Sequence, residues 1–447
     1  MGAPPSAPLV LLANFEVEQQ WGQGEFGLPT IGFAASDALV GRMDEFALLL
    51  GGPGDTVVLK EPPDPTYLDH LGKVGLALPH VLVTGSTDPA RSVTEEALRR
   101  PGVIAGLRTV AERGGVLVPH GASAAEERLA IATGLTLGTA APPVCKKVNS
   151  KLYSRRLADR IGLRQPRGWA CAALDDWDEA LAGARRLLTN GRSVAVKDAY
   201  GVSGKGIVRI RDERHLSRLD AMTRRRLERH GDGSLNLVVE EWVAKSADLN
   251  YQFTLDRDGG TRFDFVKEAV TERGVHKGHR MPAPLTGAQG DTIRRTAGEL
   301  GHALADDGYL GVVGVDAMVD PDGGLYPVVE INARLNMSTY QDRLQTELVG
   351  PERAALARHY PVRRTEPVSF AELAQALGDL LITSPHGEGL VVNNFATVNA
   401  SLAVAEPGSA PEGRLYGLVV AADHARVAFL DGRIEARLRG HFGKGAR

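Results

Sequence analysis

A β-hairpin predicted over residues 311–335 constrains the fold and the chemistry of this chain more than any other segment. Its sequence, GVVGVDAMVDPDGGLYPVVEINARL, has two apolar runs around a Pro-Asp-Gly-Gly turn. Asp316 and Glu330 lie seven residues either side of Gly323, so an antiparallel pairing places them nearly opposite each other, with Cβ atoms about 5 Å apart. Asn332 follows Glu330 by two residues and therefore points from the same face.

This group of side chains indicates a cation site. The flanking valines and isoleucine suggest a buried hairpin, where unpaired acids are costly. Mg²⁺ commonly joins one or two carboxylates to nucleotide phosphates, so Asp316, Glu330 and Asn332 are predicted to hold Mg²⁺. A solvated hairpin face with two ordinary acids is the alternative. Arg334, further along the same face, is predicted to steady an oxyanion or an acyl phosphate, and an ion pair with Glu330 is its alternative.

A glycine-rich loop joins two predicted strands, 193–199 and 206–212. The loop reads KDAYGVSGKG from Lys197 and is not a P-loop, because Ala199 replaces the first glycine, Gly206 replaces the Ser/Thr, and a strand follows. We expect a flap whose backbone N–H groups approach phosphates, with Lys197 neutralising their charge. A mobile hairpin with a Gly-rich turn is the alternative.

The strand predicted over 235–243 ends in Glu240-Glu241-Trp242-Val243. Such an end can offer its backbone to adenine, and an acid to the amino group or the ribose. A strand end that meets solvent is the alternative.

Residues 276–280, HKGHR, are predicted to form a basic loop. Its His279 and Arg280 could bind a substrate carboxylate, Arg280 being the catalytic candidate of the two. A solvated loop is the alternative.

The chain divides into three predicted domains, 1–144, 145–365 and 366–447. In the first, strands alternate with helices, which is typical of an open parallel sheet covered by helices. The second combines helices with the strands above, and the last is a small α+β cap, so the fold class is α/β and α+β. The segments predicted for the first domain are strands at 8–14, 56–60, 80–85 and 115–121, and helices at 94–115 and 124–135.

Charge and composition exclude several classes of protein. The 52 basic and 55 acidic residues give a net charge of −3, which does not support a nucleic-acid surface. The basic stretch 223–230 is interpreted as a solvated helix face. Two cysteines make no disulfide framework, so a reducing, cytoplasmic setting is expected. No apolar run approaches the roughly 18 residues of a membrane span.

The order of these motifs resembles the ATP-grasp superfamily. Lys151 opens a predicted helix, Lys197 follows 46 residues later, and the glycine loop, the EEWV strand and Asp316…Glu330-Ile-Asn332-Ala-Arg334 come in turn. The N-terminal sheet resembles a pre-ATP-grasp domain. The opening PLVLLANFEVEQQW, the string EINARLNMSTYQ and the C-terminal cap resemble the pheganomycin type of peptide ligase, which implies a place in antibiotic biosynthesis. The residues that the resemblance implies at the ATP site are Lys151, Lys197, Ser203, Gly204, Gly206, Glu240, Glu241, Val243 and Asn250.

The resemblance implies an ATP- and Mg²⁺-dependent ligase that joins an amino acid-like carboxylate to an amine through an acyl phosphate. His279, Arg280 and Ser338 would contact the substrates, which would be small amino acids or peptides. No nucleic acid or membrane partner is expected, and a homo-oligomer is left open. Two other functions remain as alternatives: a phosphotransferase that stops at a phosphorylated product, and a nucleotide-binding regulatory protein without turnover.

Overall fold

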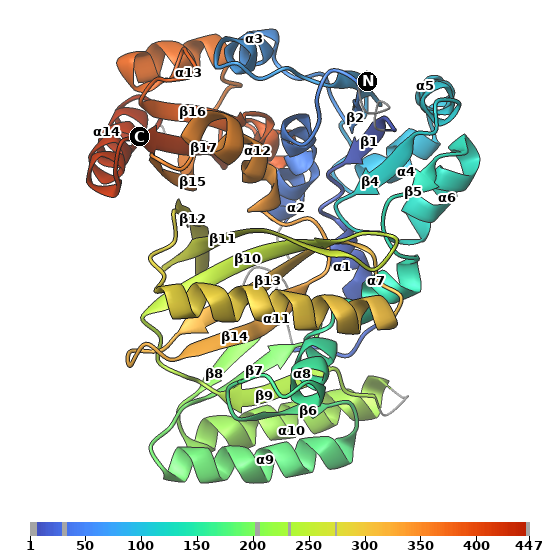
Figure 1. Cartoon of the computed structure of the whole chain (residues 1–447), viewed down its shortest axis with the longest axis vertical. Coiled ribbons are helices and arrows are strands. Elements are labelled where there is room, and N and C mark those ends of the chain that lie inside the picture. The colour runs from blue at the N-terminus through green and yellow to red at the C-terminus, as the bar shows by residue number, and fades with distance from the viewer. Residues whose placement is uncertain (1–6, 29–33, 202–205, 231–233, 273–274, 444–447) are drawn as a thin grey trace.

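The computed structural model of the chain describes residues 7–28, 34–201, 206–230, 234–272 and 275–443. Three sheets follow one another along the long axis of the molecule (Figure 1). The N-terminal sheet and the C-terminal part lie side by side at one end, the large sheet fills the middle, and a four-stranded sheet lies at the other end.

The N-terminal part is an open sheet of parallel strands in the order β3-β2-β1-β4-β5, which confirms the prediction. The helix predicted over 94–115 is instead two helices, because Pro101 favours the first turn of a new helix. The elements are β1 Leu9–Leu12, α1 Val17–Gly22, α2 Ala34–Gly41, a 3₁₀ helix Met43–Leu49, β2 Thr56–Leu59, α3 Pro65–Lys73, β3 His80–Val83, α4 Val93–Leu98, α5 Pro101–Ala111, β4 Val116–Pro119, α6 Ala124–Thr133 and β5 Thr136–Leu137.

A four-stranded unit, defined here as residues 168–241, follows two connecting helices. Its antiparallel strands run in the order β6-β9-β7-β8, and α9 and α10 cover one face. Trp177 of α9 is fully buried against the sheet. The elements are α7 Pro142–Val148, α8 Lys151–Arg160, β6 Gly168–Cys171, α9 Leu174–Thr189, β7 Val194–Asp198, β8 Ile207–Ile210, α10 Glu213–His230 and β9 Leu237–Glu241.

The central sheet has two unlike faces. On one face, Leu249 and Phe253 pack against Leu300 of α11, whose N-terminus is capped by Thr286 and Gln289. The other face carries polar side chains and looks away from α11. The elements are β10 Ala247–Leu255, β11 Thr261–Glu272, β12 Val275–Met281, α11 Gly287–Asp306, β13 Gly311–Val319 and β14 Leu325–Asn332.

The C-terminal part continues the central sheet instead of forming a sheet of its own. The eight strands run in the order β14-β13-β10-β11-β12-β15-β17-β16. The elements are a 3₁₀ turn Thr339–Gln341, α12 Asp342–Leu344, a π-helical turn Gln345–Val349, β15 Ala354–Arg363, α13 Phe370–Leu377, a 3₁₀ turn Gly378–Leu380, β16 Gly389–Asn394, 3₁₀ turns Ala396–Val398 and Ala400–Val404, β17 Glu412–Ala421 and α14 His424–Phe442.

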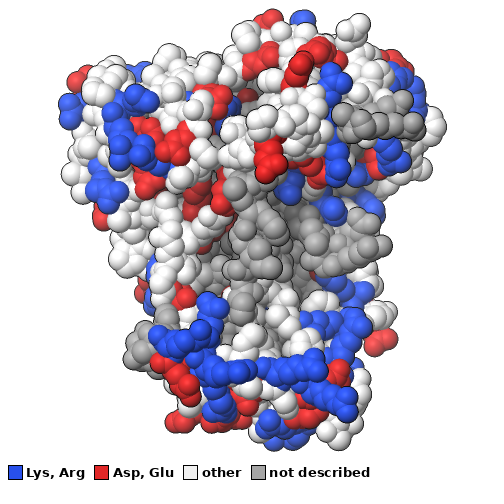
Figure 2. All heavy atoms as spheres, turned by 180° about the vertical axis from the view of Figure 1, so that it is seen from behind, with Lys and Arg blue, Asp and Glu red and all other residues white. Residues whose placement is uncertain are grey.

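Figure 2 shows basic side chains gathered over the four-stranded unit. Part of this charge is balanced within the unit, since Arg224 pairs with Asp220 at 2.8 Å and with Asp178. Arg225 and Arg229 of the same helix are exposed to solvent. Among the described helices, none has both the length and the apolar character needed to span a bilayer.

Candidate active site

Asp316 and Glu330 are direct cross-strand partners on β13 and β14, as the hairpin predicted. Asn250 lies opposite Asp316 on the neighbouring strand β10 and donates to Oδ1 of Asp316 at 2.9 Å. Asn332 donates to Oδ2 of the same carboxylate at 3.3 Å. Burial, followed by repulsion from Glu330, raises the pKa of Asp316 to about 6. A cation between the two acids would relieve this repulsion.

The donor set fits Mg²⁺ better than a soft metal. It consists of two facing carboxylates and the Asn332 amide, residue types that ligate through oxygen. In this structure the amide nitrogen of Asn332 faces Asp316 and its oxygen faces Arg334. No cluster of three His, Cys, Asp or Glu side chains able to hold a metal occurs in the described ranges. A site with few protein ligands suits Mg²⁺, which usually keeps several waters and binds phosphate oxygens.

Lys151 connects the carboxylates to the glycine-rich loop. It is the first residue of α8, and its Nζ lies 2.7 Å from Oε1 of Glu330. The same Nζ donates to the carbonyl of Gly201 at 2.6 Å, and the Lys151 backbone N–H donates to Ala199 at 3.0 Å. The ammonium group therefore lies between the predicted metal ligands and the start of the loop.

Lys197 and Glu240 form an ion pair on the four-stranded unit. Arg155 of α8 approaches the same carboxylate at 3.6 Å. Glu241 points from the other face of β9 and pairs with Arg192 at 3.5 Å, and Val243 follows, half-buried. The structure therefore groups Lys197 with Glu240 and places Glu241 apart from them.

Gly206 closes the root of the glycine loop in a conformation that favours glycine. Its φ is +84°, and a Cβ there would lie 2.5 Å from Oδ2 of Asp198. The Gly206 carbonyl accepts the backbone N–H of Asp198 at 2.9 Å. Ser203 and Gly204, predicted to contact phosphates, lie outside the described residues.

Arg334 lies beside the carboxylates, as predicted, but its acidic partner is not Glu330. Its guanidinium donates to Oδ1 of Asn332 at 2.9 Å and lies 3.0 Å from Oε1 of Glu18 in the N-terminal domain. His120 Nε2 reaches the same Glu18 oxygen at 3.1 Å. Sequence reasoning missed Glu18 and His120, although both follow the carboxyl ends of strands in a parallel sheet, where ligands of such sheets bind.

Ser338 is fully buried and supports the site through its hydrogen bonds. Its Oγ donates to Oδ1 of Asn250 at 2.6 Å, and its carbonyl accepts from Lys267 Nζ at 2.8 Å. Burial lowers the pKa of Lys267 to about 7. Lys267, another residue missed from the sequence, lies opposite Asn250 on β11. These bonds join the segment after β14 to Asp316 through Asn250, so we assign Ser338 a supporting position.

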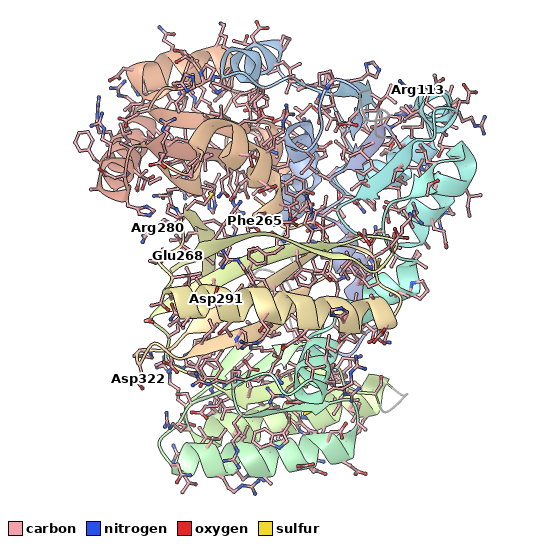
Figure 3. All side chains as sticks on the ribbon, in the orientation of Figure 1. Arg113, Phe265, Glu268, Arg280, Asp291 and Asp322 are labelled. Atoms are coloured by element: carbon pink, nitrogen blue, oxygen red, sulfur yellow. The ribbon has the colours of Figure 1, made fainter. Side chains whose placement is uncertain are left out.

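The structure corrects the interpretation of residues 276–280 as a loop, because they belong to strand β12. Arg280 pairs in register with Glu268, and Glu268 with Leu249, so all three point to the α11 face, away from Asp316. Figure 3 shows Arg280 beside Glu268, and their side chains lie 3.2 Å apart. Arg280 is therefore not part of the candidate site. His279 points to the same face as Asn250 and is buried.

A segment of the N-terminal domain, residues 25–28, also reaches the four-stranded unit; we call it the strap. Phe26 and Leu28 are buried in the hydrophobic core of that unit. The Leu28 backbone N–H donates to Oδ1 of Asp198, next to the glycine loop, at 2.5 Å. Glu25 accepts from Asn236 at 2.7 Å. The strap therefore links α1, which carries Glu18, to the strands that carry Lys197 and Glu240.

Two family models match this arrangement. Residues 43–135 match the pre ATP-grasp domain, and residues 150–342 match the ATP-binding domain of the carbamoyl-phosphate synthase L chain. The two matched segments are a pre-ATP-grasp domain followed by an ATP-grasp domain. Together the two matched segments contain Lys151, Lys197, Asp316, Glu330 and Arg334.

Two curated relatives show where this protein is similar to known enzymes. It is 27% identical over 331 residues to a [butirosin acyl-carrier protein]–L-glutamate ligase of Niallia circulans, a match that covers 72% of this chain and 71% of the relative. It is also 27% identical over 209 residues to the arginine-specific large chain of carbamoyl phosphate synthase of Eremothecium gossypii. That match covers 45% of this chain and 17% of the relative.

Solved structures show the same fold across nearly the whole chain. An ADP complex of an N5-carboxyaminoimidazole ribonucleotide synthetase matches 99% of both chains, with a TM-score of 0.54 and 12% identity. A biotin carboxylase from Campylobacter jejuni matches 94% of this chain and 89% of its own length, with a TM-score of 0.53 and 13% identity.

Proposed function

We propose that the protein joins a carboxylate to an amine at the expense of ATP, through an acyl phosphate. The observation that carries the proposal is the opposed pair Asp316 and Glu330 with Lys151 beside it, at the start of a glycine-rich loop. This group combines the oxygen ligands and the cationic charge that phosphoryl transfer from a nucleotide needs. The similarity to an L-glutamate ligase over most of the chain supports the same chemistry.

In the first proposed step, an oxygen of the substrate carboxylate attacks the γ-phosphorus of ATP. The bond from that phosphorus to the β,γ-bridging oxygen breaks, and ADP leaves with the electron pair. Lys151 and Lys197 hold the phosphates in this proposal. Asp316, Glu330 and Asn332 would hold Mg²⁺, which would supply neutralising charge to the transferring group. Positioning and charge neutralisation supply most of the rate enhancement in such a transfer.

In the second proposed step, the amine attacks the carbonyl carbon of the acyl phosphate. Arg334 lies where it can donate to the developing oxyanion, because it is held next to Asn332 at the edge of the metal site. The C–O bond to phosphate breaks, and an amide and inorganic phosphate are formed. We propose that the acid is an amino acid or a short peptide. The product would then be a peptide, as expected of a ligase of the pheganomycin type.

A screen of acids with hydroxylamine as the nucleophile tests this function. The protein is mixed with Mg-ATP, hydroxylamine and each amino acid in turn, including L-glutamate, and hydroxamate and phosphate are measured. Hydroxamate and phosphate in equal amounts, dependent on one acid, are expected. A stable phosphorylated product that does not react with hydroxylamine would instead indicate a phosphotransferase. Nucleotide binding with no product from any acid would indicate a regulatory protein.

A further inference from the structure

Glu18 lies at the point of the N-terminal sheet where the strand order reverses. Because β4 lies on the opposite side of β1 from β2, the carboxyl ends of β1 and β4 form the topological switch point of this sheet. Helix α1 follows β1 and carries Glu18, and His120 follows β4 directly. Open sheets of this kind bind their ligands at such a switch point, and here Glu18 meets Arg334 of the ATP-grasp domain at 3.0 Å.

The carboxylate of Glu18 is held firmly and remains partly open. Oε1 contacts both Arg334 and His120, and the side chain keeps 15% of its surface exposed. Burial lowers the pKa of His120 to about 4, so its neutral ring donates from Nε2 to Glu18 and accepts at Nδ1 from the Tyr340 hydroxyl at 2.9 Å. Burial acts to raise the pKa of Glu18, but Arg334 and His120 outweigh it and hold the pKa below its ordinary value.

The balance of charge at this site changes when the nucleotide is bound in the proposed way. Without it, Glu18 faces Arg334, and Glu330 faces Lys151. With it, Glu330 would hold Mg²⁺, Lys151 would hold the phosphates, and Arg334 would turn toward the acyl phosphate. Arg334 is then shared between Glu18 and the substrate, and Glu18 is a nearly buried negative charge without a cation of its own. Such a charge is costly unless another cation approaches it.

We propose that Glu18 binds the attacking amine in its ammonium form and takes one of its protons. This proposal rests on the ligase function proposed above. After that transfer the neutral amine attacks the acyl carbon, the C–O bond to phosphate breaks, and the second proton goes to the leaving phosphate as HPO₄²⁻. Glu18, which is partly exposed, then releases the first proton to solvent. The pre-ATP-grasp domain thereby contributes the amine site, and the ATP-grasp domain contributes the sites for nucleotide and acid.

Two classes of nucleophile, one uncharged and one cationic, test the proposal. Near neutral pH hydroxylamine is mainly uncharged, whereas ammonium and amino acids carry a positive amino group. With the acid that gives the strongest hydroxamate signal, rates are measured for wild type and Glu18→Gln, using hydroxylamine, ammonium chloride and a set of amino acids as nucleophiles. Asp37→Asn, which removes an exposed acid of the same domain, is the matched control.

In Glu18→Gln we expect hydroxamate formation within about threefold of wild type, and amide formation from cationic amines reduced by about tenfold or more through a higher KM. Asp37→Asn should leave both rates unchanged. Equal losses with both classes of nucleophile would show that Glu18 serves only to hold Arg334, and would overturn the proposal. So would an unchanged KM for the amines, or a wild type that uses hydroxylamine but no cationic amine. If no acid gives hydroxamate in wild type, the ligase function itself fails, and this proposal with it.

Discussion

Nζ of Lys151 lies 2.7 Å from Oε1 of Glu330, so the amino group of one predicted phosphate ligand neutralises one predicted metal ligand. A divalent ion that binds Glu330 must replace this contact, and the lysine is then available to the phosphates that arrive with the ion. The ion pair thus keeps a partly buried acid neutralised before the nucleotide binds. It also couples metal binding to nucleotide binding, because each one offers a new partner to one member of the pair.

Glu330→Gln tests the metal site. The amide keeps the shape of the side chain and removes its charge, so the rate of acid-dependent phosphate release should fall by about 100-fold or more, because a metal contributes several kcal/mol to charge stabilisation. Removing Mg²⁺ from wild type with EDTA should have a similar effect. Circular dichroism and thermal unfolding check that the fold is intact. A near-normal rate in Glu330→Gln would show that the metal binds elsewhere.

Arg280→Ala tests the corrected placement of that side chain. Arg280 points to the α11 face, where it pairs with Glu268 and is 45% exposed. Exposed pairs of this kind contribute little, so the activity should remain within about twofold of wild type and the stability within about 0.5 kcal/mol. Steady-state rates and urea unfolding measure both quantities. A loss of activity beyond about tenfold would show that Arg280 does belong to the active site.

Phe26→Ala tests the strap. Phe26 is buried in the core of the four-stranded unit, although it belongs to the N-terminal domain. Its truncation should cost about 3–4 kcal/mol, and the loss should appear as faster hydrogen exchange in β6–β9 and not in β10–β14. Phe429→Ala, at an exposed phenylalanine on α14, is the control and should change neither region. Unchanged exchange in β6–β9 of Phe26→Ala would contradict the role assigned to the strap.

Glu45→Gln tests a buried acid between the N-terminal and C-terminal parts. Burial raises the pKa of Glu45 to about 7, although it accepts the N–H groups of Phe395 at 2.7 Å and Ala396 at 2.8 Å. The folded protein therefore holds a proton that the unfolded chain releases near pH 4.5, so this residue's contribution to stability falls as the pH rises from about 4.5 to about 7. Over this pH range, the free energy of unfolding of the variant should fall by up to about 3 kcal/mol less than that of wild type. Thermal unfolding across that range checks it, and parallel curves for both proteins would refute it.

The sequence predicted the parts of the site that local geometry determines. The hairpin around the Pro-Asp-Gly-Gly turn forms and Asp316 faces Glu330, as predicted. The turn alone does not set this register, because Met318 pairs with Tyr326 beside the turn and a β-bulge between Asp316 and Met318 then shifts the pairing so that Asp316 meets Glu330. The alternation of strands and helices likewise predicted the parallel N-terminal sheet, which the structure contains. Each of these features depends on residues that are close along the chain, where periodicity and turn chemistry are informative.

The parts that were missed or wrong depend on contacts between distant segments. Glu18 reaches Arg334 only because two domains pack together, and no pattern near either residue records that contact. Residues 276–280 were predicted to form a loop, but Gly278 lies inside strand β12. A Cβ there would lie 1.7 Å from the carbonyl of Ala357 on β15, so the glycine permits close strand pairing. The predicted domain boundary near residue 365 stays a prediction.

The pairing of β15 with both β12 and β17 has a practical consequence for anyone dividing this chain into pieces. A fragment that ends near residue 365 would keep β15 and lose β17, leaving a ten-residue row of backbone donors and acceptors open to other chains. It would also uncover Leu356 and Tyr360, which pack against the part removed. Such a fragment is expected to aggregate even with an intact nucleotide site, so insolubility after truncation would say nothing about catalysis.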